Sequence, residues 1–288
     1  MAEVLVVDDA STDDSAAQAR EADDGSGRLK ILTQPRNAGP SAARNRGIRE
    51  SSAPWIALLD ADDFFLPGRI KRLFAFADKA DFIADDIGQV SENAVEGARR
   101  DLLGVRFGRP RAIGFAEFVF SNVTDPKRER GELGFIKPLM RRQFLAEHSL
   151  AYQEHMHLGE DYELYARSLA LGARLYVVPT VGYVSVVRPN SLSGRHSETD
   201  LLHLRNCDYL LGQISGLAPL DKKALRAHFL SVDCRYQWCM LVLAVKQRNV
   251  RAAFAAFLRP HPVPYYLAGK LAEQVVLRTK KKLKGAHA

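Results

Sequence analysis

The stretch WIALLDADD, residues 55–63, decides the fold class of this chain. It is an apolar run of the kind that forms a buried strand, and an acidic run follows directly where that strand would end. Residues 3–14, EVLVVDDASTDD, show the same pattern of an apolar run followed by acidic residues. Segments of helical composition separate the short apolar runs, at 13–22, 39–50 and 67–77. This alternation predicts an α/β fold, in which helices cover both faces of a mainly parallel sheet.

The whole chain has an ordinary globular composition: 288 residues, of which 47% are hydrophobic and 26% charged. This excludes a disordered or collagen-like protein. No apolar run reaches the ~18 residues that a membrane-spanning helix needs, and the N-terminus lacks the basic and apolar regions of a secretory signal. Cys207, Cys234 and Cys239 match no zinc-binding spacing and are typical of reduced thiols. We therefore expect a cytoplasmic protein.

The charge of the chain changes along its length. Residues 1–100 carry 13 basic and 18 acidic side chains, whereas residues 201–288 carry 15 and 4. Strand-like segments end before residue 199, so we expect an α/β domain at 1–198 and a helical, basic C-terminal extension at 199–288. A uniformly basic chain would suggest a nucleic-acid partner. The gradient instead indicates separate roles for the two ends and no nucleic acid.

Acidic side chains follow two of the predicted strands. Asp8 and Asp9 end the first, and Asp60, Asp62 and Asp63 end the third. The carboxyl ends of parallel strands meet at one edge of a sheet, where open α/β sheets bind their ligands. An Asp-x-Asp pair can hold one divalent cation that keeps positions open for phosphate oxygens. Either cluster alone could equally consist of helix caps and turn formers, but the two clusters on neighbouring strand ends favour a binding site.

Two predicted helices begin with residues suited to a ligand. The segment NAGPSAARNRG at 37–47 starts a helix whose first backbone N–H groups can face an anion, and Arg44 follows one turn later. Glu160 and Asp161 start another helix, where the helix dipole stabilises a carboxylate as the anion. A carboxylate in this position suits a proton acceptor or a simple helix cap equally well.

These segments together resemble the inverting family 2 glycosyltransferases, which have the GT-A fold, of the bacterial type that builds surface polysaccharides and exopolysaccharides. The resemblance spans about residues 3–195. It rests on VDDASTDD at 7–14, NxGxxxxRNxG at 37–47, LDADD at 59–63, GED at 159–161 and RPNSLS at 188–193. Each motif alone is common, but five in the family's order are a specific signal.

The resemblance implies that residues 1–198 are the catalytic domain of a metal-dependent hexosyltransferase. Such an enzyme moves a sugar from a nucleotide-diphosphate sugar, here a UDP-sugar, to an acceptor hydroxyl with inversion. Asp161, beside Glu160, would be the catalytic base, and Asp62 with Asp63 would hold Mg²⁺ or Mn²⁺ across the diphosphate. The implied acceptor is a lipid-linked sugar or an oligosaccharide. The implied nucleotide-sugar ligands are Asp8, Asp9, Asn37, Gly39, Arg44, Asp60 and Arg188.

The chain departs from the family because it lacks the usual first strand and starts at the second. The first strand lies centrally in the family's sheet, so its absence exposes backbone groups and removes nucleotide contacts. Two explanations therefore stay open: either Met1 is not the natural start of the protein, or the chain is a non-catalytic nucleotide-binding module of the same fold. A third interpretation is a receiver-type phospho-acceptor domain, since Asp8, Asp9 and Asp60 resemble its acidic site. That interpretation does not account for the 37–47 motif or for Asp161.

Residues 266–284 predict an amphipathic helix, in which Leu267, Leu271 and Val275 recur four residues apart. An apolar stripe with a basic cluster suits a helix on an anionic membrane surface. This would place the protein peripherally on the inner face of the cell membrane. The alternative, in which the stripe packs against the rest of the protein, stays open. The basic residues are Lys270, Arg278, Lys280, Lys281, Lys282 and Lys284.

Overall fold

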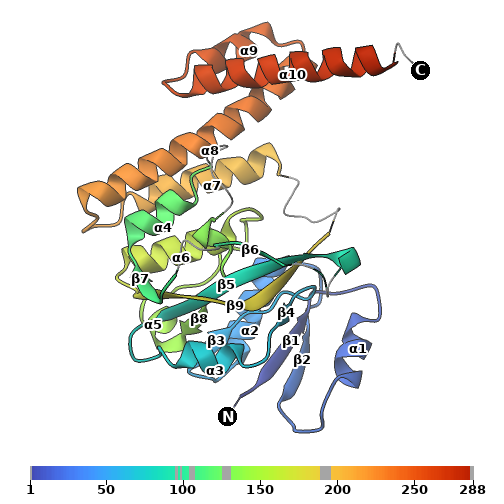
Figure 1. Cartoon of the computed structure of the whole chain (residues 1–288), viewed down its shortest axis with the longest axis vertical. Helices are drawn as coiled ribbons and strands as arrows, with labels where there is room; N and C mark the ends of the chain where they lie inside the picture. Colours follow the sequence, from blue (N-terminus) through green and yellow to red (C-terminus); the bar gives the residue numbers. More distant parts are fainter. Residues whose placement is uncertain are drawn as a thin grey trace.

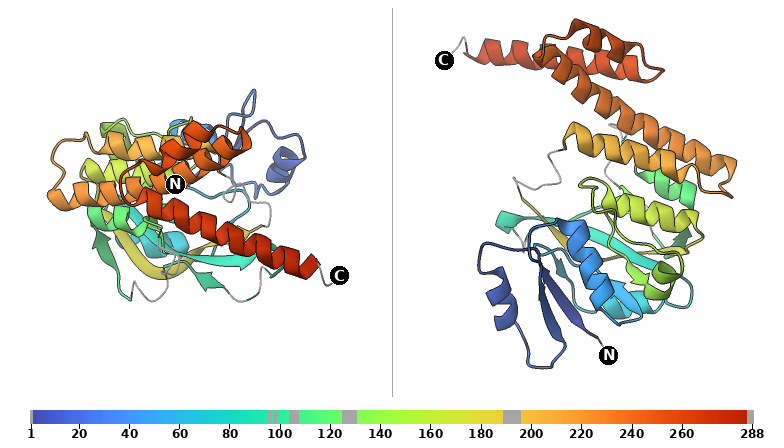
Figure 2. Two further views of the ribbon diagram at one scale, coloured as in Figure 1. Left: turned by 90° about the horizontal axis from the view of Figure 1, so that it is seen from above. Right: turned by 180° about the vertical axis from the view of Figure 1, so that it is seen from behind.

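The computed structural model describes residues 2–94, 97, 99–103, 108–124, 131–188 and 196–285. An α/β body holds the strands, and helices from the last third of the chain stack on one end of it (Figure 1). The view from behind in Figure 2 shows the N-terminus and the last two helices at opposite ends of the molecule.

The first two strands form a small sheet of their own. β1 (Val4–Asp8) and β2 (Leu29–Thr33) pair in parallel. α1 (Ser15–Glu21) connects them, and α2 (Pro40–Glu50) follows β2 and packs on β1. A parallel pair with its crossover helix is the unit that the alternating sequence predicts.

A seven-stranded mixed sheet forms the centre of the body, in the order β3-β8-β5-β9-β4, with β6 on β5 and β7 on β9. Among its described strands β5 and β9 are parallel, and the other pairs are antiparallel. The α/β class is confirmed, but the expected mainly parallel pairing is wrong for this sheet. β8 is antiparallel to β3 and β5, and the prediction failed because an apolar run of sequence carries no strand direction. The strands are β3 (Trp55–Ala57), β4 (Phe64–Phe65), β5 (Phe82–Ser91), β6 (Arg100–Asp101), β7 (Arg111–Ile113), β8 (Leu139–Arg141) and β9 (Leu175–Val187).

The two sheets are separate at β1. Among the described strands, β1 pairs with β2 alone and β3 pairs with β8 alone. No residue of β1 is fully buried, and Val4 keeps 54% of its surface exposed.

Helices cover both faces of the larger sheet. Along β5, side chains alternate, so Phe82 and Ala84 enter the main core on one face while Ile83 enters a smaller cluster on the other. Leu73 joins Ile83 there. The main core is covered by α4 (Phe115–Ser121), α5 (Arg142–Glu147) and α6 (Glu160–Ala170), and the smaller cluster by α3 (Arg69–Phe74).

The predicted helical extension is present, and it shares its core with the body. Leu204 and Leu225, from its first two helices, lie in the main core. The second half of α8 packs with α9 and α10 around a separate cluster that contains Leu241 and Leu267. No helix in the described part of the chain is long and apolar enough to cross a membrane. The helices are α7 (Glu198–Leu211), α8 (Pro219–Lys246), α9 (Val250–Phe257) and α10 (Val263–Gly285).

A buried polar group joins α6 to α7 and α8. Tyr162 Oη donates a hydrogen bond to Asp208 Oδ1 at 2.8 Å, and His228 Nδ1 lies 2.7 Å from Asp208 Oδ2. The rings of Tyr162 and His228 stack with their centroids 4.2 Å apart. Burial and then the charge of Asp208 raise the pKa of Tyr162, so its hydroxyl stays a donor. The extension is thereby tied to the helix that carries Glu160 and Asp161.

Replacing Asp208 should therefore destabilise the body and the extension together. Asp208→Ala should lower the free energy of unfolding by roughly 2–4 kcal/mol, because Tyr162 and His228 both lose a buried partner. Urea unfolding would be followed by fluorescence in two variants, one keeping only Trp55 in the body and the other only Trp238 in α8.

Both transitions should shift by the same amount, since the helix that carries Trp238, α8, is anchored in the main core by its first half. Glu273→Ala removes an exposed ion pair with Lys270 and serves as the control, with an expected change below about 1 kcal/mol. A shift of the Trp238 transition alone would contradict the shared core.

Candidate functional site

Arg44 joins carboxylates from distant parts of the chain. Its guanidinium, on α2, lies 2.7 Å from Asp60 Oδ1, 3.0 Å from Glu160 Oε1 and 3.7 Å from Asp161 Oδ1. Asp60 follows β3, while Glu160 and Asp161 begin α6. The structure thus brings four of the residues indicated by the sequence into direct contact.

Lys137 supplies a second cation that the sequence did not indicate as a site residue. It precedes β8, and its buried Nζ lies 2.6 Å from Asp161 Oδ2 and 3.0 Å from Asp60 Oδ2. Burial acts to lower the pKa of Lys137, but the charges of Asp161 and Asp60 outweigh burial, and the pKa is raised. The amine therefore stays protonated between the two carboxylates.

The two cations explain how three carboxylates can share one small volume. Asp60, Glu160 and Asp161 oppose Arg44 and Lys137, which leaves a formal charge of −1 on the cluster. Burial acts to raise the pKa of Asp60, but Lys137 and Arg44 outweigh burial and lower it to about 2. Asp60 is therefore ionised at neutral pH.

Asp161 is buried, and both of its oxygens accept hydrogen bonds. Oδ2 accepts from Lys137, while Oδ1 accepts from Tyr152 Oη at 3.0 Å and from Tyr165 Oη at 3.3 Å. Burial and then the charge of Asp161 raise the pKa of each tyrosine, so the hydroxyls remain donors. Oδ2 accepts one hydrogen bond from the described residues, so this oxygen keeps a lone pair that can receive a proton from a substrate.

Gly159 and Asn45 hold this cluster in place. Gly159 precedes α6 with a φ of 74°, and a Cβ there would lie 2.7 Å from Leu204 Cδ1, so both the backbone conformation and the space favour glycine. Asn45 follows Arg44; its side chain accepts from the Tyr152 N–H at 2.8 Å and donates to the Tyr152 carbonyl at 2.9 Å. α2 thereby positions both Arg44 and the tyrosine that contacts Asp161.

The two predicted metal ligands lie in different environments. Asp62 is exposed, with Arg188 Nε 3.9 Å from its Oδ2 and also 3.5 Å from Glu92. Asp63 accepts from Tyr183 Oη at 2.7 Å and from the Val186 N–H at 2.9 Å, and burial raises its pKa. Asp62 therefore has oxygens free for a ligand, whereas those of Asp63 attach the turn to β9. The rest of the RPNSLS motif, residues 189–193, lies outside the described residues.

A divalent cation fits this arrangement as a partner of substrate phosphates. The described residues contain no group of three His, Cys, Asp or Glu side chains placed to hold a metal. Mg²⁺ commonly binds through one or two carboxylates together with phosphate oxygens. The exposed Asp62 is a donor of this kind, and the nearby Arg188 can contact the same phosphates.

The predicted nucleotide ligands of the small sheet form a second group. Asp8 accepts from Ser11 at the end of β1, and these hydrogen bonds lower its pKa. Asp9 accepts from the N–H groups of Ala38 and Gly39 at 2.9 and 2.7 Å. Gly39 caps α2 with a φ of 86°, and the side chain of Asn37 is exposed. Asp9 therefore fixes the loop that leads into the helix of Arg44.

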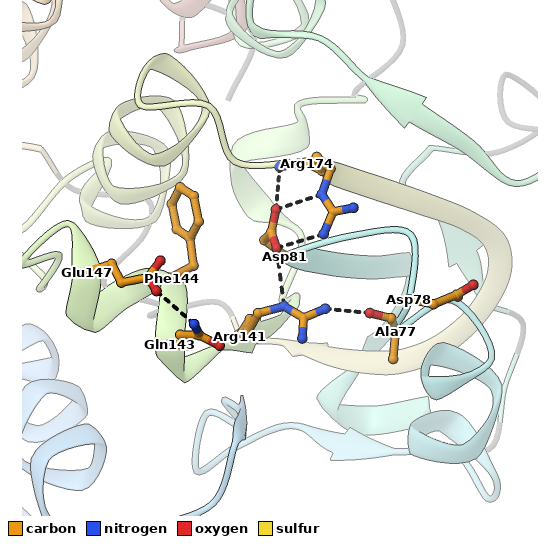
Figure 3. Close-up of a pocket in the computed structure, with 8 residues that line it drawn as sticks. All are labelled: Ala77, Asp78, Asp81, Arg141, Gln143, Phe144, Glu147 and Arg174. Carbon is orange, nitrogen blue, oxygen red and sulfur yellow. Dashed lines mark hydrogen bonds and ion pairs between the residues drawn. The ribbon is translucent and has the colours of Figure 1, made fainter.

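A hollow of about 460 Å³ lies at the opposite ends of the strands (Figure 3). Asp81, at the start of β5, accepts from Arg141 Nε at 3.2 Å and Arg174 Nε at 3.0 Å. Burial acts to raise the pKa of Asp81, but its hydrogen bonds with Arg174 outweigh this and lower it. Arg141 and Arg174 are thus both paired with Asp81, and no residue of the Arg44 cluster lines the hollow.

The fold is similar to those of solved nucleotide-sugar complexes. TarS of S. aureus, solved with UDP-GlcNAc, matches with a TM-score of 0.60 at 17% identity, over 87% of this chain and 80% of that one. The mannosyltransferase PcManGT of Pyrobaculum calidifontis, solved with GDP-Man and Mn²⁺, matches with a TM-score of 0.54 at 18% identity, over 96% and 70%. At these identities the likeness shows the fold.

Sequence comparison shows the family. The family model described as Glycosyl transferase family 2 matches residues 2–132. The succinoglycan biosynthesis protein ExoU of Rhizobium meliloti is 44% identical over 277 residues, which cover 95% of this chain and 80% of that protein. ExoO of the same organism is 36% identical over 193 residues, 66% of this chain and 54% of its own length. The chain is therefore a glycosyltransferase and belongs to glycosyl transferase family 2.

Proposed function

We propose that this chain transfers a hexosyl group from a UDP-sugar to an acceptor hydroxyl with inversion, in a metal-dependent reaction. The observation that carries the proposal is the meeting of Asp60, Glu160 and Asp161 around Arg44 and Lys137, beside the carboxyl end of β3. The nucleotide sugars in the complexes of TarS and PcManGT support a donor of this class.

The proposed donor lies along the strand ends. Asp8, Asp9 and the loop 37–39 serve the nucleoside, with Asp9 toward the base and Asp60 toward the ribose. Arg188 lies at the other end, where its positive charge suits the diphosphate. Asp62 would hold Mg²⁺ or Mn²⁺, with Asp63 fixing the turn behind it. The ion, when bound, offsets the charge that grows on the departing diphosphate.

Asp161 is the proposed base. The acceptor oxygen forms a bond to the anomeric carbon while the bond from that carbon to the diphosphate oxygen breaks, and UDP leaves with the electron pair. The hydroxyl proton passes to Asp161. Lys137 and Arg44 stabilise the charge of the carboxylate before this step, and the Tyr152 hydroxyl orients it.

The proposed acceptor is a lipid-linked sugar of exopolysaccharide synthesis at the inner face of the cell membrane. The descriptions of ExoU and ExoO as succinoglycan biosynthesis proteins support this pathway class. The family assignment leaves no place for the receiver-type interpretation.

The break beside β1 favours a second candidate, a nucleotide-binding module without turnover. Incubation of the chain with UDP-sugars, Mg²⁺ or Mn²⁺ and a sugar acceptor distinguishes the two. Release of UDP with formation of a glycoside supports the transferase, whereas UDP binding without product supports the module.

Asp161→Asn should lower the rate of sugar transfer by roughly 10²–10⁴-fold, because the acceptor proton loses its base. Metal-dependent UDP binding, measured by titration calorimetry, should stay nearly unchanged. Asp78→Asn, at the separate hollow of Figure 3, is the control and should leave the rate unaltered. Near-normal transfer by the Asp161 variant would remove this residue from the mechanism.

Lys137→Met should lower the rate at neutral pH and move the acid limb of the pH–rate profile upward by about 1–3 units. The reason is that the charge of Lys137 lowers the pKa of Asp60, so that without this cation Asp60 takes up a proton at a higher pH. A purely structural lysine would change the rate equally at every pH. An unmoved acid limb would therefore refute the positioning role of Lys137.

Asp62→Ala should weaken UDP binding in Mg²⁺ or Mn²⁺ by roughly tenfold or more, since a cation ligand is lost. In excess EDTA, parent and variant should bind UDP alike. Asp63→Asn is the matched comparison: it should lower the melting temperature, because Tyr183 and Val186 lose a carboxylate partner, and keep the metal dependence. If the parent binds UDP equally well with and without excess EDTA, the Asp62 site holds no ion.

A further inference from the structure

Exposed apolar side chains gather on the last helices of the chain. Among the described residues, seventeen large apolar side chains are exposed, and nine of these lie between Val245 and Leu277. This segment stands at the end of the molecule away from β1 and β2 (Figures 1 and 2). A concentration of this kind is typical of a binding surface for protein or membrane.

α9 exposes a strip of large apolar side chains. Val250 and Phe254 on this helix and Leu258, its C-cap residue, occur four residues apart and are 78%, 66% and 71% exposed. This spacing places them along one side of the helix. Ala256, on the other side, is buried in the cluster shared with α8 and α10. The strip therefore takes no part in the packing of the extension.

α10 divides the apolar stripe that the sequence predicts. Val263 and Leu267 are fully buried in the cluster with α8. Leu271 and Val275, one and two turns later, are 42% and 64% exposed. Packing uses the start of the stripe and leaves the rest available for contact with another surface.

The same segment is strongly basic. Residues 246–285 contain ten Lys and Arg residues and one acidic residue, Glu273. Glu273 is already paired with Lys270 at 2.7 Å. This charge attracts an anionic surface and repels a second copy of itself. The exposed basic residues include Lys246, Arg248, Arg251, Arg259 and Arg278.

We propose that α9 and α10 together dock this protein on a membrane surface rich in anionic lipid, with Phe254, Leu258 and Val275 entering the headgroup layer. Apolar side chains and positive charge on one segment match a lipid surface in both respects. A nucleic acid would use the charge alone, and a second copy would use the apolar side chains against like charge. The inference extends the proposed function. Docking is measured without sugar transfer, so the docking proposal and the proposed transferase activity can be tested separately.

The test is sedimentation of the full chain with phosphatidylcholine vesicles, with and without phosphatidylglycerol. The protein should sediment with the anionic vesicles only, and less as salt rises. The triple variant Phe254→Ser, Leu258→Ser, Val275→Ser should bind the anionic vesicles at least roughly tenfold more weakly than the parent, since it lacks the inserted side chains. Deletion of residues 278–288 should also weaken binding, because it removes basic charge.

The matched control replaces three equally exposed apolar residues outside the surface, as Tyr209→Ser, Leu210→Ser, Leu220→Ser. It should bind like the parent, and the melting temperatures should agree. The single variants Phe254→Ser and Val275→Ser, on different helices, should each weaken binding even if the triple variant unfolds. Sedimentation of the parent with neither vesicle, or equal sedimentation by parent and single variants, would overturn the proposal. Two other results would also overturn the proposal. One is that the parent is a dimer without vesicles and that the substitutions dissociate it. The other is that DNA binds the parent and the variants equally and displaces the vesicles.

Discussion

The sharing of two cations among three carboxylates is the interaction on which the site depends. Without Arg44 and Lys137, the charges of Asp60, Glu160 and Asp161 would repel in a partly dehydrated volume. The five members come from four places in the chain: α2, the end of β3, the segment before β8, and the start of α6. The ion pairs therefore fix the strand ends and two helices relative to one another.

The sequence predicted the site where its signal is local. Asp60, Glu160, Asp161 and Arg44 belong to short motifs at element ends, and the structure brings them together. Lys137 belongs to no motif. It reaches Asp161 only because β8, which starts two residues later, pairs with β5. Tyr152 was missed for the same reason, since Asn45 places it from 107 residues away. Asp62 and Asp63 belong to one motif, but a motif does not show which way each side chain points. Asp62 lies near Arg188, whereas Asp63 accepts hydrogen bonds from β9.

The fold divides in a similar way. Alternating apolar runs and helices predicted the α/β class, but an apolar run carries no direction, so the antiparallel pairing of β8 could not be foreseen. The stripe of α10 was visible as periodicity, yet periodicity does not show which turn packs inside. Leu267 is buried and Val275 exposed because the cluster around Leu241 ends between them. Both outcomes depend on tertiary contacts, which local patterns do not contain.

The length of α8 has a consequence for what the enzyme can reach. This helix has 28 residues, so it is about 42 Å long. Its first half belongs to the core that holds α6, and its second half to the cluster that carries α9 and α10. α8 is therefore a rigid spacer, and each residue added to it would lift α9 and α10 by about 1.5 Å and turn them by about 100°. With α9 and α10 resting on a bilayer, Asp161 would stand at a fixed height and facing above the lipid. Acceptors would then be selected by how far their sugar chain extends, and not by the identity of the terminal sugar alone.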